Sequence, residues 1–463
     1  MIVSIALDLG TTSVKAGLLD QHGELSNITS RPAPKITVTG GHYESDALPY
    51  AAVVEQVLKD CIAQAGDCGS LGLCSQRSSF LVWEQATGKP LTPLISWQDN
   101  RGAVSCEALQ AHERSIRSLT GLPLTPYYFA PKLRVLLQNN PEWKARLEQG
   151  ELRVGTLDTF LIWRWSGGRH FVTDASMAAR TLLMDIRQQQ WSSQLCKLFA
   201  IPLGILPEIK PSAGLNIRLD NGLTLQASIG DQSAALLASV SEDHAEALVN
   251  LGTGGFVVRY LAEEMSATDG YLRTLVYQGS THRSHLAIEG TLNSIAAALS
   301  PYPVKECIAD ELAEIDDIFC VAEPSGLGAP YFRGDIGIRF SHPVDNLSQH
   351  HIAALLLEAI IFRVARILED FHRESAIERV YLSGGLSSLT CLQQGIAQCV
   401  PFDTYRLPET ESSLRGAALL AAGMPPASHR ESRRILMACD ATRLVEKYRR
   451  WKVWFDDLLS SGR

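Results

Sequence analysis

Two short turns, each rich in glycine and threonine and each placed between apolar strands, constrain the fold of this 463-residue chain most strongly. The first turn spans residues 8–12 and is followed by a predicted strand over 13–19; the second spans residues 252–255. Glycine lets the backbone turn tightly and approach a ligand, and the neighbouring amides and hydroxyls form a concavity suited to phosphate. Either turn alone is equally well explained as a solvated hairpin. Two such turns in one chain predict two related halves that bind one nucleotide.

Strands alternate with helices in two sets, which predicts an α/β fold with a mixed sheet in each domain. With 46% hydrophobic residues, the chain can form two substantial cores. A polar interval at residues 239–246 separates the two sets, so we predict domains at 1–240 and 241–463.

The net charge of −8 and the lack of a long basic run argue against a nucleic-acid partner.

No feature of the sequence predicts export or membrane insertion. The first residues lack the basic region of a signal peptide, and the most apolar run, at 352–364, contains Glu358 and Arg363. The ten cysteines show no metal-ligand spacing and no C-x-x-C pair, which indicates reduced thiols in a cytoplasmic protein. Four of them lie in apolar-periodic contexts and are expected to be buried: Cys61, Cys68, Cys74 and Cys391.

The turns suggest particular phosphate and metal ligands. Asp8 is a poor phosphate ligand but a good anchor for a hydrated Mg²⁺, and the turn that follows supplies donors from Gly10, Thr11 and Thr12. Lys15 either neutralises the γ-phosphate or is simply a solvent-exposed lysine on a strand. Further along, Gly384 and Gly385 are predicted to open a helix whose N-terminus faces the nucleotide.

Asp231 is the strongest catalytic candidate, since it ends a predicted strand at 223–229 and precedes a helix. It can act as a general base or as a helix N-cap, and the two roles are compatible. Arg77 and Asp99 follow apolar strands, and either bind substrate or pair with each other. Tyr127 lies in a proline-stiffened loop, where packing is the simpler explanation. Asp158 and Arg180 are interpreted as structural.

The order of these motifs resembles the FGGY carbohydrate kinases, over residues 5–423. The resemblance rests on Asp8-Leu9-Gly10-Thr11-Thr12, Trp97-Gln98-Asp99, Gly230-Asp231-Gln232, Gly252-Thr253-Gly254, Gly326-Leu327-Gly328-Ala329-Pro330-Tyr331, Ser383-Gly384-Gly385 and Leu414-Arg415-Gly416-Ala417-Ala418. It implies two ribonuclease-H-like domains of the actin-like ATPase fold, with the active site in the interdomain cleft. It also implies ATP and Mg²⁺ as cofactors, Asp8 as the metal ligand and Asp231 as the base. The implied nucleotide-binding residues are Gly10, Thr11, Thr12, Lys15, Gly252, Thr253, Gly254, Gly384 and Gly385.

Within the family, the glycerol kinases are most similar, through Gln76-Arg77, Lys89-Pro90, Trp97-Gln98-Asp99 and the spacing from Pro126-Tyr127 to Lys132. This implies an acceptor site formed by Arg77, Ser78, Asp99, Tyr127, Asp231 and Gln232. Ser78 stands where glycerol kinases have a glutamate. On the nucleotide side, Leu389 replaces the usual asparagine, and Ala296 and Ser300 stand where the family supplies a glycine and a glutamine.

We therefore expect an ATP-dependent kinase that phosphorylates a hydroxyl of a small polyol or sugar, with a glycerol-like acceptor favoured. A ketopentose kinase acting on xylulose or ribulose is the alternative within this class. Two other classes stay open: a nucleotide-dependent scaffold of the actin-like fold, and a degenerate member that binds sugar as a regulator. A homodimer is compatible with the sequence.

Overall fold

In a computed structural model, which describes residues 1–262, 270–408, 411–425, 432–436 and 442–461, the chain forms two compact units. Two segments that we predicted to lie in the second domain, at 273–286 and 411–427, pack with the first unit. Neither unit is therefore continuous in sequence. Unit 1 comprises Met1–Ala238, Arg273–Leu286 and Glu411–Ala427, and unit 2 comprises Ser239–Leu272, Ala287–Thr410 and Ser428–Arg463.

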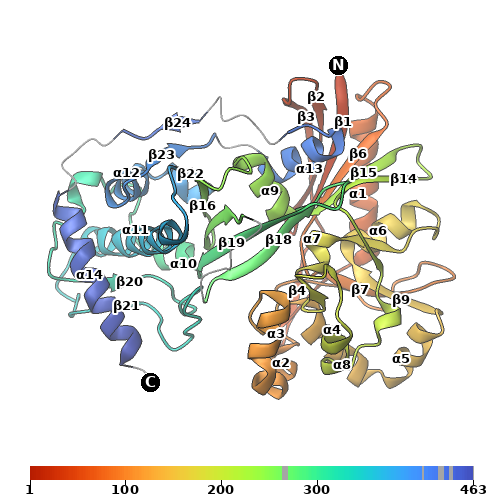
Figure 1. Cartoon of the computed structure of the whole chain (residues 1–463), viewed down its shortest axis with the longest axis horizontal. Helices are drawn as coiled ribbons and strands as arrows, with labels where there is room; N and C mark the ends of the chain where they lie inside the picture. Colours follow the sequence, from red (N-terminus) through yellow and green to blue (C-terminus); the bar gives the residue numbers. More distant parts are fainter. Residues whose placement is uncertain (263–269, 409–410, 426–431, 437–441, 462–463) are drawn as a thin grey trace. The chain divides into compact units, whose positions relative to one another are not determined.

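Unit 1 is built on a six-stranded mixed sheet in the order β14-β15-β6-β1-β2-β3 (Figure 1). The first three strands form an antiparallel meander, and β6 and β15 continue the sheet on the other side of β1, parallel to it. The strands are β1 (Ile2–Leu9), β2 (Ser13–Asp20), β3 (Leu25–Pro32), β6 (Ser70–Ser75), β14 (Ala213–Arg218) and β15 (Thr224–Gly230).

A seven-stranded sheet, in the order β18-β19-β17-β16-β22-β23-β24, supplies the framework of unit 2, although β18 and the first residues of β19 belong to the segment 273–286 that packs with unit 1. Its part β19-β17-β16-β22-β23 repeats β3-β2-β1-β6-β15 of unit 1: β16 pairs antiparallel with β17, and β22 and β23 follow in parallel. The prediction of two related halves is confirmed. The strands are β16 (Glu246–Leu251), β17 (Gly255–Tyr260), β18 (Leu272–Gln278), β19 (Ser284–Leu292), β22 (Arg379–Ser383), β23 (Asp403–Arg406) and β24 (Arg433–Arg434).

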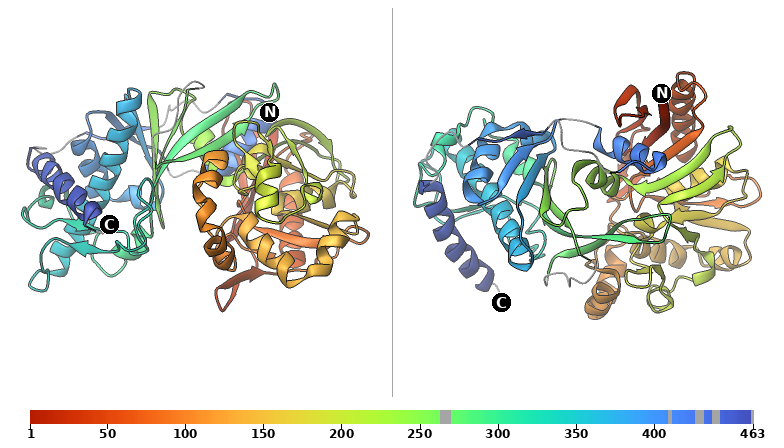
Figure 2. Two further views of the ribbon diagram at one scale, coloured as in Figure 1. Left: turned by 60° about the horizontal axis from the view of Figure 1, so that its bottom comes forward. Right: turned by 45° about the horizontal axis from the view of Figure 1, so that its top comes forward.

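Helices α1 (Ala47–Ile62) and α13 (Ser412–Ala422) cover opposite faces of the first sheet (Figures 1 and 2). Successive side chains of a strand point to opposite faces. In β1, odd-numbered residues such as Leu7 share a core with α1, whereas the hydroxyl of Ser4 donates to the Ala418 carbonyl in α13 at 2.8 Å. Helix α13 approaches so closely that a Cβ at Gly72 would lie 2.1 Å from the Ala417 carbonyl oxygen. A glycine in β6 therefore permits this packing.

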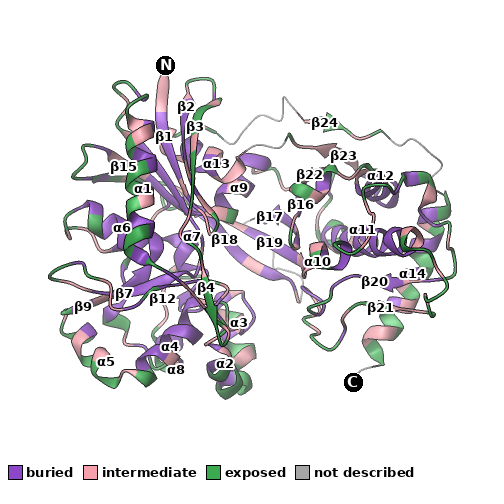
Figure 3. Cartoon of the chain, turned by 180° about the vertical axis from the view of Figure 1, so that it is seen from behind, coloured by how far each residue is buried: buried purple, intermediate pink, exposed green. Residues whose placement is uncertain are grey.

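The long helix α11 (Gln349–Glu374) is the apolar segment whose charges argued against a membrane span, and it is mostly buried in unit 2 (Figure 3). Both of its buried charges have partners. Glu358 pairs with Lys447, and the Arg363 guanidinium lies 2.8 Å from Glu323. Within the described part of the chain, no helix is both long and apolar enough to cross a membrane.

Residues 103–120 form three consecutive short helices, α2 (Ala103–Leu109), η1 (Gln110–His112) and α3 (Glu113–Thr120). Strand β10 (Val172–Asp174) leads directly into the short helix α7 (Ala175–Ala178). Asp174 caps α7, accepting hydrogen bonds from the backbone amides of Ser176 and Met177 at 2.8 and 3.0 Å.

The remaining described elements connect these sheets and helices. They are β4 (Thr37–Thr39), β5 (His42–Ser45), β7 (Phe80–Glu84), β8 (Leu94–Ile95), α4 (Phe129–Asn139), α5 (Pro141–Glu148), β9 (Leu152–Thr156), α6 (Leu157–Trp165), β11 (Met184–Asp185), β12 (Gln190–Trp191), α8 (Ser193–Leu198), η2 (Leu203–Ile205), β13 (Glu208–Lys210), α9 (Asp231–Ser239), α10 (Ile295–Leu299), η3 (Ala309–Glu311), β20 (Cys320–Val321), β21 (Arg339–Phe340), η4 (Gly385–Ser388), α12 (Thr390–Cys399) and α14 (Thr442–Ser460).

Candidate active site

In unit 1, three parallel strands end side by side and bring three of the predicted residues together. Asp8 near the end of β1 is in register with Cys74 of β6, and Cys74 is in register with Ile229 of β15. Arg77 follows β6 and Asp231 follows β15, so that the Arg77 Nε lies 3.6 Å from a carboxylate oxygen of Asp231. The carboxyl ends of parallel strands are where α/β sheets bind ligands.

Gly10 shapes the turn that follows Asp8. A Cβ at this position would lie 2.6 Å from the Ser13 carbonyl oxygen, so a larger residue would force the turn open. The Gly10 carbonyl accepts hydrogen bonds from the Tyr50 hydroxyl at 2.7 Å and from the Gln76 side-chain amide at 3.3 Å. Tyr50 and Gln76 were not among our predicted site residues. Their hydrogen bonds to the Gly10 carbonyl fix the position of the turn.

The two threonines of this turn, Thr11 and Thr12, differ in their contacts. The Thr11 hydroxyl donates to the Gln76 side-chain carbonyl at 3.3 Å and accepts from the Trp97 indole N–H at 3.1 Å. Thr12 is exposed, and its backbone carbonyl accepts from Ala33 at 3.0 Å. The Thr12 side chain is therefore the more accessible of the two.

Asp8 has the electrostatics expected of a cation ligand. Its Oδ1 is buried and has no hydrogen-bond partner among the described residues. Burial, reinforced by the negative charge of Asp231, raises the pKa of Asp8 to about 7. An orphaned buried carboxylate oxygen beside a second carboxylate is costly unless a positive charge is supplied. The residues present therefore fit a divalent cation such as Mg²⁺.

Lys15 lies on β2, is partly exposed and has an acidic partner. Its ammonium group forms an ion pair with Glu411, with Nζ–O distances of 2.6 and 2.7 Å. Glu411 directly precedes α13 and is 396 positions away in the sequence. No local signal in the sequence marks Glu411 as a partner of Lys15.

Asp231 is the first residue of α9, and its carboxylate accepts a hydrogen bond from the Gln232 amide at 2.7 Å. Burial raises the pKa of Asp231, and the positive charges of Arg77 and Arg180 partly oppose this rise. Gly230 makes the arrangement possible, because a Cβ there would lie 2.8 Å from the Arg77 Cδ. The glycine thus lets the arginine side chain pass the end of β15.

The predicted acceptor residues differ in how accessible they are. Asp99 is fully buried and accepts hydrogen bonds from the Arg101 side chain at 2.7 and 2.9 Å and from the Tyr43 amide at 2.8 Å. The described partner of Asp99 is Arg101, whereas Arg77 lies beside Asp231. The Asp99 carboxylate therefore links Arg101 to the backbone of Tyr43.

Ser78 and Tyr127 show the same contrast between buried and exposed. Ser78 is buried with a φ of +64°, and its hydroxyl donates to the Arg180 carbonyl at 2.8 Å. The Ser78 carbonyl accepts from the buried ammonium of Lys132 at 2.9 Å. Tyr127 is 51% exposed, and Gln232 is also exposed.

In unit 2, the predicted nucleotide residues gather around the turn between β16 and β17. The Gly252 amide donates to the Gly254 carbonyl at 2.9 Å, and the Thr253 carbonyl accepts from the Ala296 amide at 3.2 Å. Gly384, with a φ of +86°, approaches this hairpin so closely that a Cβ would lie 2.5 Å from the Leu251 carbonyl oxygen.

Gly384 and Gly385 open a helix, as predicted, and this helix is a short 3₁₀ helix. Gly385 begins the short 3₁₀ turn η4, and helix α12 starts only at Thr390. Leu389, half-buried, lies immediately before α12. Ser300 directly follows α10 and is exposed.

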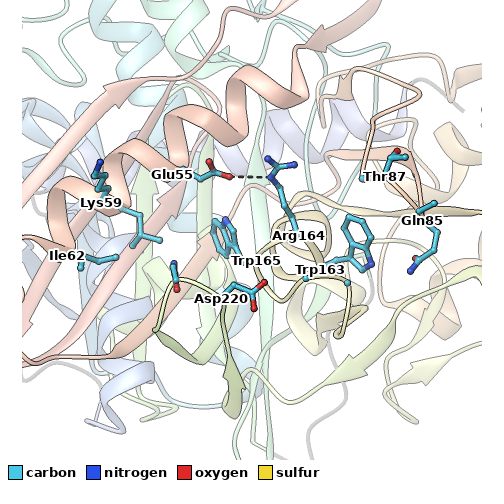
Figure 4. A pocket seen from close by; sticks show the side chains of 15 residues that line it. Glu55, Lys59, Ile62, Gln85, Thr87, Trp163, Arg164, Trp165 and Asp220 are labelled. Atoms are coloured by element: carbon cyan, nitrogen blue, oxygen red, sulfur yellow. Dashed lines mark hydrogen bonds and ion pairs between the residues drawn. The ribbon is translucent and has the colours of Figure 1, made fainter.

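A separate pocket of about 840 Å³ lies in unit 1 between α1, α6 and neighbouring loops (Figure 4). Trp163, Trp165 and Ile62 form its apolar walls, and the Glu55–Arg164 ion pair, at 3.2 Å, lies at its side. The described residues that line it include none of the predicted site residues.

Comparison with known proteins agrees with this architecture. The N-terminal domain model of the FGGY family of carbohydrate kinases matches residues 3–241, and the C-terminal domain model matches residues 247–424. Glycerol kinases of Alkalilimnicola ehrlichii and Shewanella baltica are 32% and 30% identical to the chain; each alignment covers 90% of this chain and 89% of the relative.

Two solved structures show the same fold. The glycerol kinase of Plasmodium falciparum with ADP has a TM-score of 0.86 at 24% identity and 98% coverage of both chains. A ligand-bound xylulose kinase from Lactobacillus acidophilus has a TM-score of 0.85 at 17% identity, with 99% of this chain and 98% of that chain covered. Both have the two-domain fold of the actin-like ATPases, with ribonuclease-H-like sheets. The chain therefore belongs to the FGGY family of carbohydrate kinases and is an ATP-dependent phosphotransferase that acts on an alcohol group.

Proposed function

We propose that this kinase transfers the γ-phosphate of ATP to a hydroxyl of a small polyol, with glycerol or a close relative as the acceptor. The observation that carries the proposal is the Asp231 carboxylate beside Arg77, at the strand ends where Asp8 also lies. The glycerol kinases among the relatives support the same acceptor class.

Asp231 would act as the general base. Its carboxylate would accept the proton of the acceptor hydroxyl as that oxygen bonds to the γ-phosphorus and the bond to the bridging oxygen of ADP breaks. Because burial raises the pKa of Asp231, the carboxylate is a stronger base than an exposed aspartate. Arg77 keeps it ionised and would donate hydrogen bonds to the acceptor.

Asp8 and the turn after it would hold the phosphates. The backbone amides of Gly10, Thr11 and Thr12 would donate to phosphate oxygens, and Asp8 would hold Mg²⁺, directly or through water. The bound ion would neutralise phosphate charge. In this scheme Lys15 would leave Glu411 and contact the γ-phosphate.

We assign the acceptor to the N-terminal domain, 1–240, and the nucleotide to the C-terminal domain, 241–463. The amides of Gly252, Thr253 and Gly254 would bind phosphate from that domain, and Gly384 and Gly385 would lie against the nucleotide. Leu389, Ala296 and Ser300 would give the adenine pocket more apolar walls than the family's usual polar side chains.

Ser78 favours a second candidate acceptor, a ketopentose such as xylulose or ribulose. A glutamate at this position would accept hydrogen bonds from acceptor hydroxyls, each worth about 1.5–3 kcal/mol when the acceptor group is ionised. The Ser78 hydroxyl is already committed to the Arg180 carbonyl. The site therefore binds glycerol with fewer partners and leaves room for a longer acceptor.

The experiment that tests the proposal is ADP release measured with ATP and Mg²⁺, with and without glycerol, erythritol, ribulose or xylulose. We expect release to depend on an added acceptor. Equal release without any acceptor would favour the scaffold, and binding without release would favour the regulator. We also propose that the enzyme acts in the cytoplasm.

A further inference from the structure

Three side chains of metal-ligating type meet in unit 2, and none of them has a part in the kinase mechanism. Cys307 is buried just before η3, Glu311 is the last residue of η3, and His350 lies in the first turn of α11. The sulfur, a carboxylate oxygen and a ring nitrogen all lie within 4.8 Å of one another. The Glu311 Oε2 and the His350 Nε2 are 2.7 Å apart.

The separations suit a small tetrahedral ion. With Zn–N, Zn–O and Zn–S bonds of about 2.0–2.3 Å, two ligand atoms of a tetrahedral zinc lie about 3.3–3.8 Å apart. The observed separations, from 2.7 Å to at most 4.8 Å, bracket this range. Rotations of the half-exposed Glu311 and His350 side chains would bring the sulfur, oxygen and nitrogen atoms to these separations with little movement of the backbone.

A purely structural explanation accounts for only part of the cluster. Glu311 also accepts a hydrogen bond from the Ile308 amide at 3.0 Å, so this carboxylate closes its own 3₁₀ turn and pairs with a histidine at the surface. That explains Glu311 and His350 without a metal. It gives no reason for a thiol within reach of both.

We propose that Cys307, Glu311 and His350 bind one Zn²⁺ ion, with water in the fourth position, and thereby fasten η3 to α11. Thiolate, imidazole and carboxylate are the ligands zinc takes in proteins, whereas Mg²⁺ prefers oxygen alone. On binding, the Cys307 thiol releases its proton to solvent, and neutral His350 carries its hydrogen on Nδ1 so that Nε2 is the ligand. Among the described residues, Glu306 near Cys307 and His351 near Glu311 also act on this cluster through their charges.

Cobalt is the probe, because Co²⁺ occupies zinc sites and a bound thiolate then gives an intense near-ultraviolet charge-transfer absorption. The reduced, chelator-treated full-length protein should bind one Co²⁺ per chain with this absorption. Cys307→Ser should abolish it, and Cys399→Ser, which removes another buried thiol of unit 2, should keep it. His350→Gln and Glu311→Gln should each weaken binding by at least about tenfold.

Thermal unfolding gives an independent readout, since an ion that binds only the folded state raises Tm. Zn²⁺ should raise the Tm of the wild type but not that of His350→Gln, whose half-exposed position makes misfolding a minor concern. The proposal does not rest on the kinase mechanism: Asp231→Asn should bind Co²⁺ as the wild type does. Absence of the charge-transfer band in the wild type, or its persistence in Cys307→Ser, would overturn the zinc site.

Discussion

The guanidinium Nε of Arg77 lies 3.6 Å from the carboxylate of Asp231, whereas the side chain of Arg101 donates to the carboxylate of Asp99. This places one cation and one carboxylate together at the ends of β6 and β15 while the other carboxylate is enclosed by Arg101. The pair therefore combines a base with the group that controls its ionisation.

Replacing Asp231 with asparagine should lower kcat by about 10²–10⁴-fold while the fold persists, because a positioned base is removed but the side chain stays isosteric. Phosphotransfer assays, circular dichroism and nucleotide binding together check this. Asp220→Asn, which alters an exposed carboxylate paired with Arg169, is the matched control and should retain activity. Near-normal turnover of Asp231→Asn would remove Asp231 from the mechanism.

Replacing Arg77 with methionine should move the acidic limb of the pH profile of kcat/KM toward higher pH. Burial already raises the pKa of Asp231, and Arg77 opposes that rise, so loss of the cation raises this pKa further. The base then stays protonated to higher pH. The acceptor KM should rise as well. An unchanged acidic limb would mean that another group limits the rate.

Mg²⁺ affinity should depend on pH through Asp8, whose pKa is raised to about 7. Below that value protonated Asp8 cannot hold the ion, so the apparent affinity should fall by up to about tenfold per pH unit. Asp8→Asn should bind Mg²⁺ weakly and lose this pH dependence, with little change in acceptor KM. A large rise in acceptor KM with normal Mg²⁺ dependence would contradict the assignment.

The raised pKa of Asp8 should also affect the folding stability of the protein in the absence of Mg²⁺. The pKa of Asp8 is higher in the folded protein than in the unfolded chain. Ionising Asp8 therefore lowers the free energy of unfolding, increasingly as the pH rises from about 4 to 7. Asp8→Asn should therefore be more resistant to denaturant than the wild type at pH 8. The difference should vanish near pH 4.

The Lys15–Glu411 pair tests whether Lys15 reaches the phosphate. The two side chains are 26% and 35% exposed, so breaking the pair should change stability by no more than about 1 kcal/mol. If Lys15 moves to the γ-phosphate, Lys15→Met raises the KM for ATP and Glu411→Gln lowers it. The double variant should then match Lys15→Met. Small effects of the same sign in both single variants would show that the pair is only structural.

Ser78→Glu should shift kcat/KM toward glycerol and away from longer acceptors, because the carboxylate adds a hydrogen-bond acceptor and fills space. Ser78→Ala is the control, since it removes the bond to the Arg180 carbonyl without adding charge. Glycerol, erythritol, ribulose and xylulose should be compared in all three proteins. If the wild type already strongly prefers glycerol and Ser78→Glu gains nothing, the argument from Ser78 is wrong.

Local pattern alone determined much of this protein. Apolar runs on either side of a polar turn marked β1 and β2, and the glycine and threonine residues of the turns at 8–12 and 252–255 marked the two hairpins. These features depend on neighbours in the chain, and so does the placement of Asp231 after β15. The order of such motifs was enough to indicate the family and the repeated sheet.

Only the tertiary structure decided which groups are partners. Lys15 pairs with Glu411, and Gln76 supports the turn at Gly10; neither pairing leaves a local trace in the sequence. Ion pairs and hydrogen bonds form wherever packing brings charges and dipoles together, irrespective of their distance along the chain. For the same reason, the segment at 411–427 could be assigned to unit 1 only once α13 was seen to pack on β1 and β6, where Gly72 gives it room.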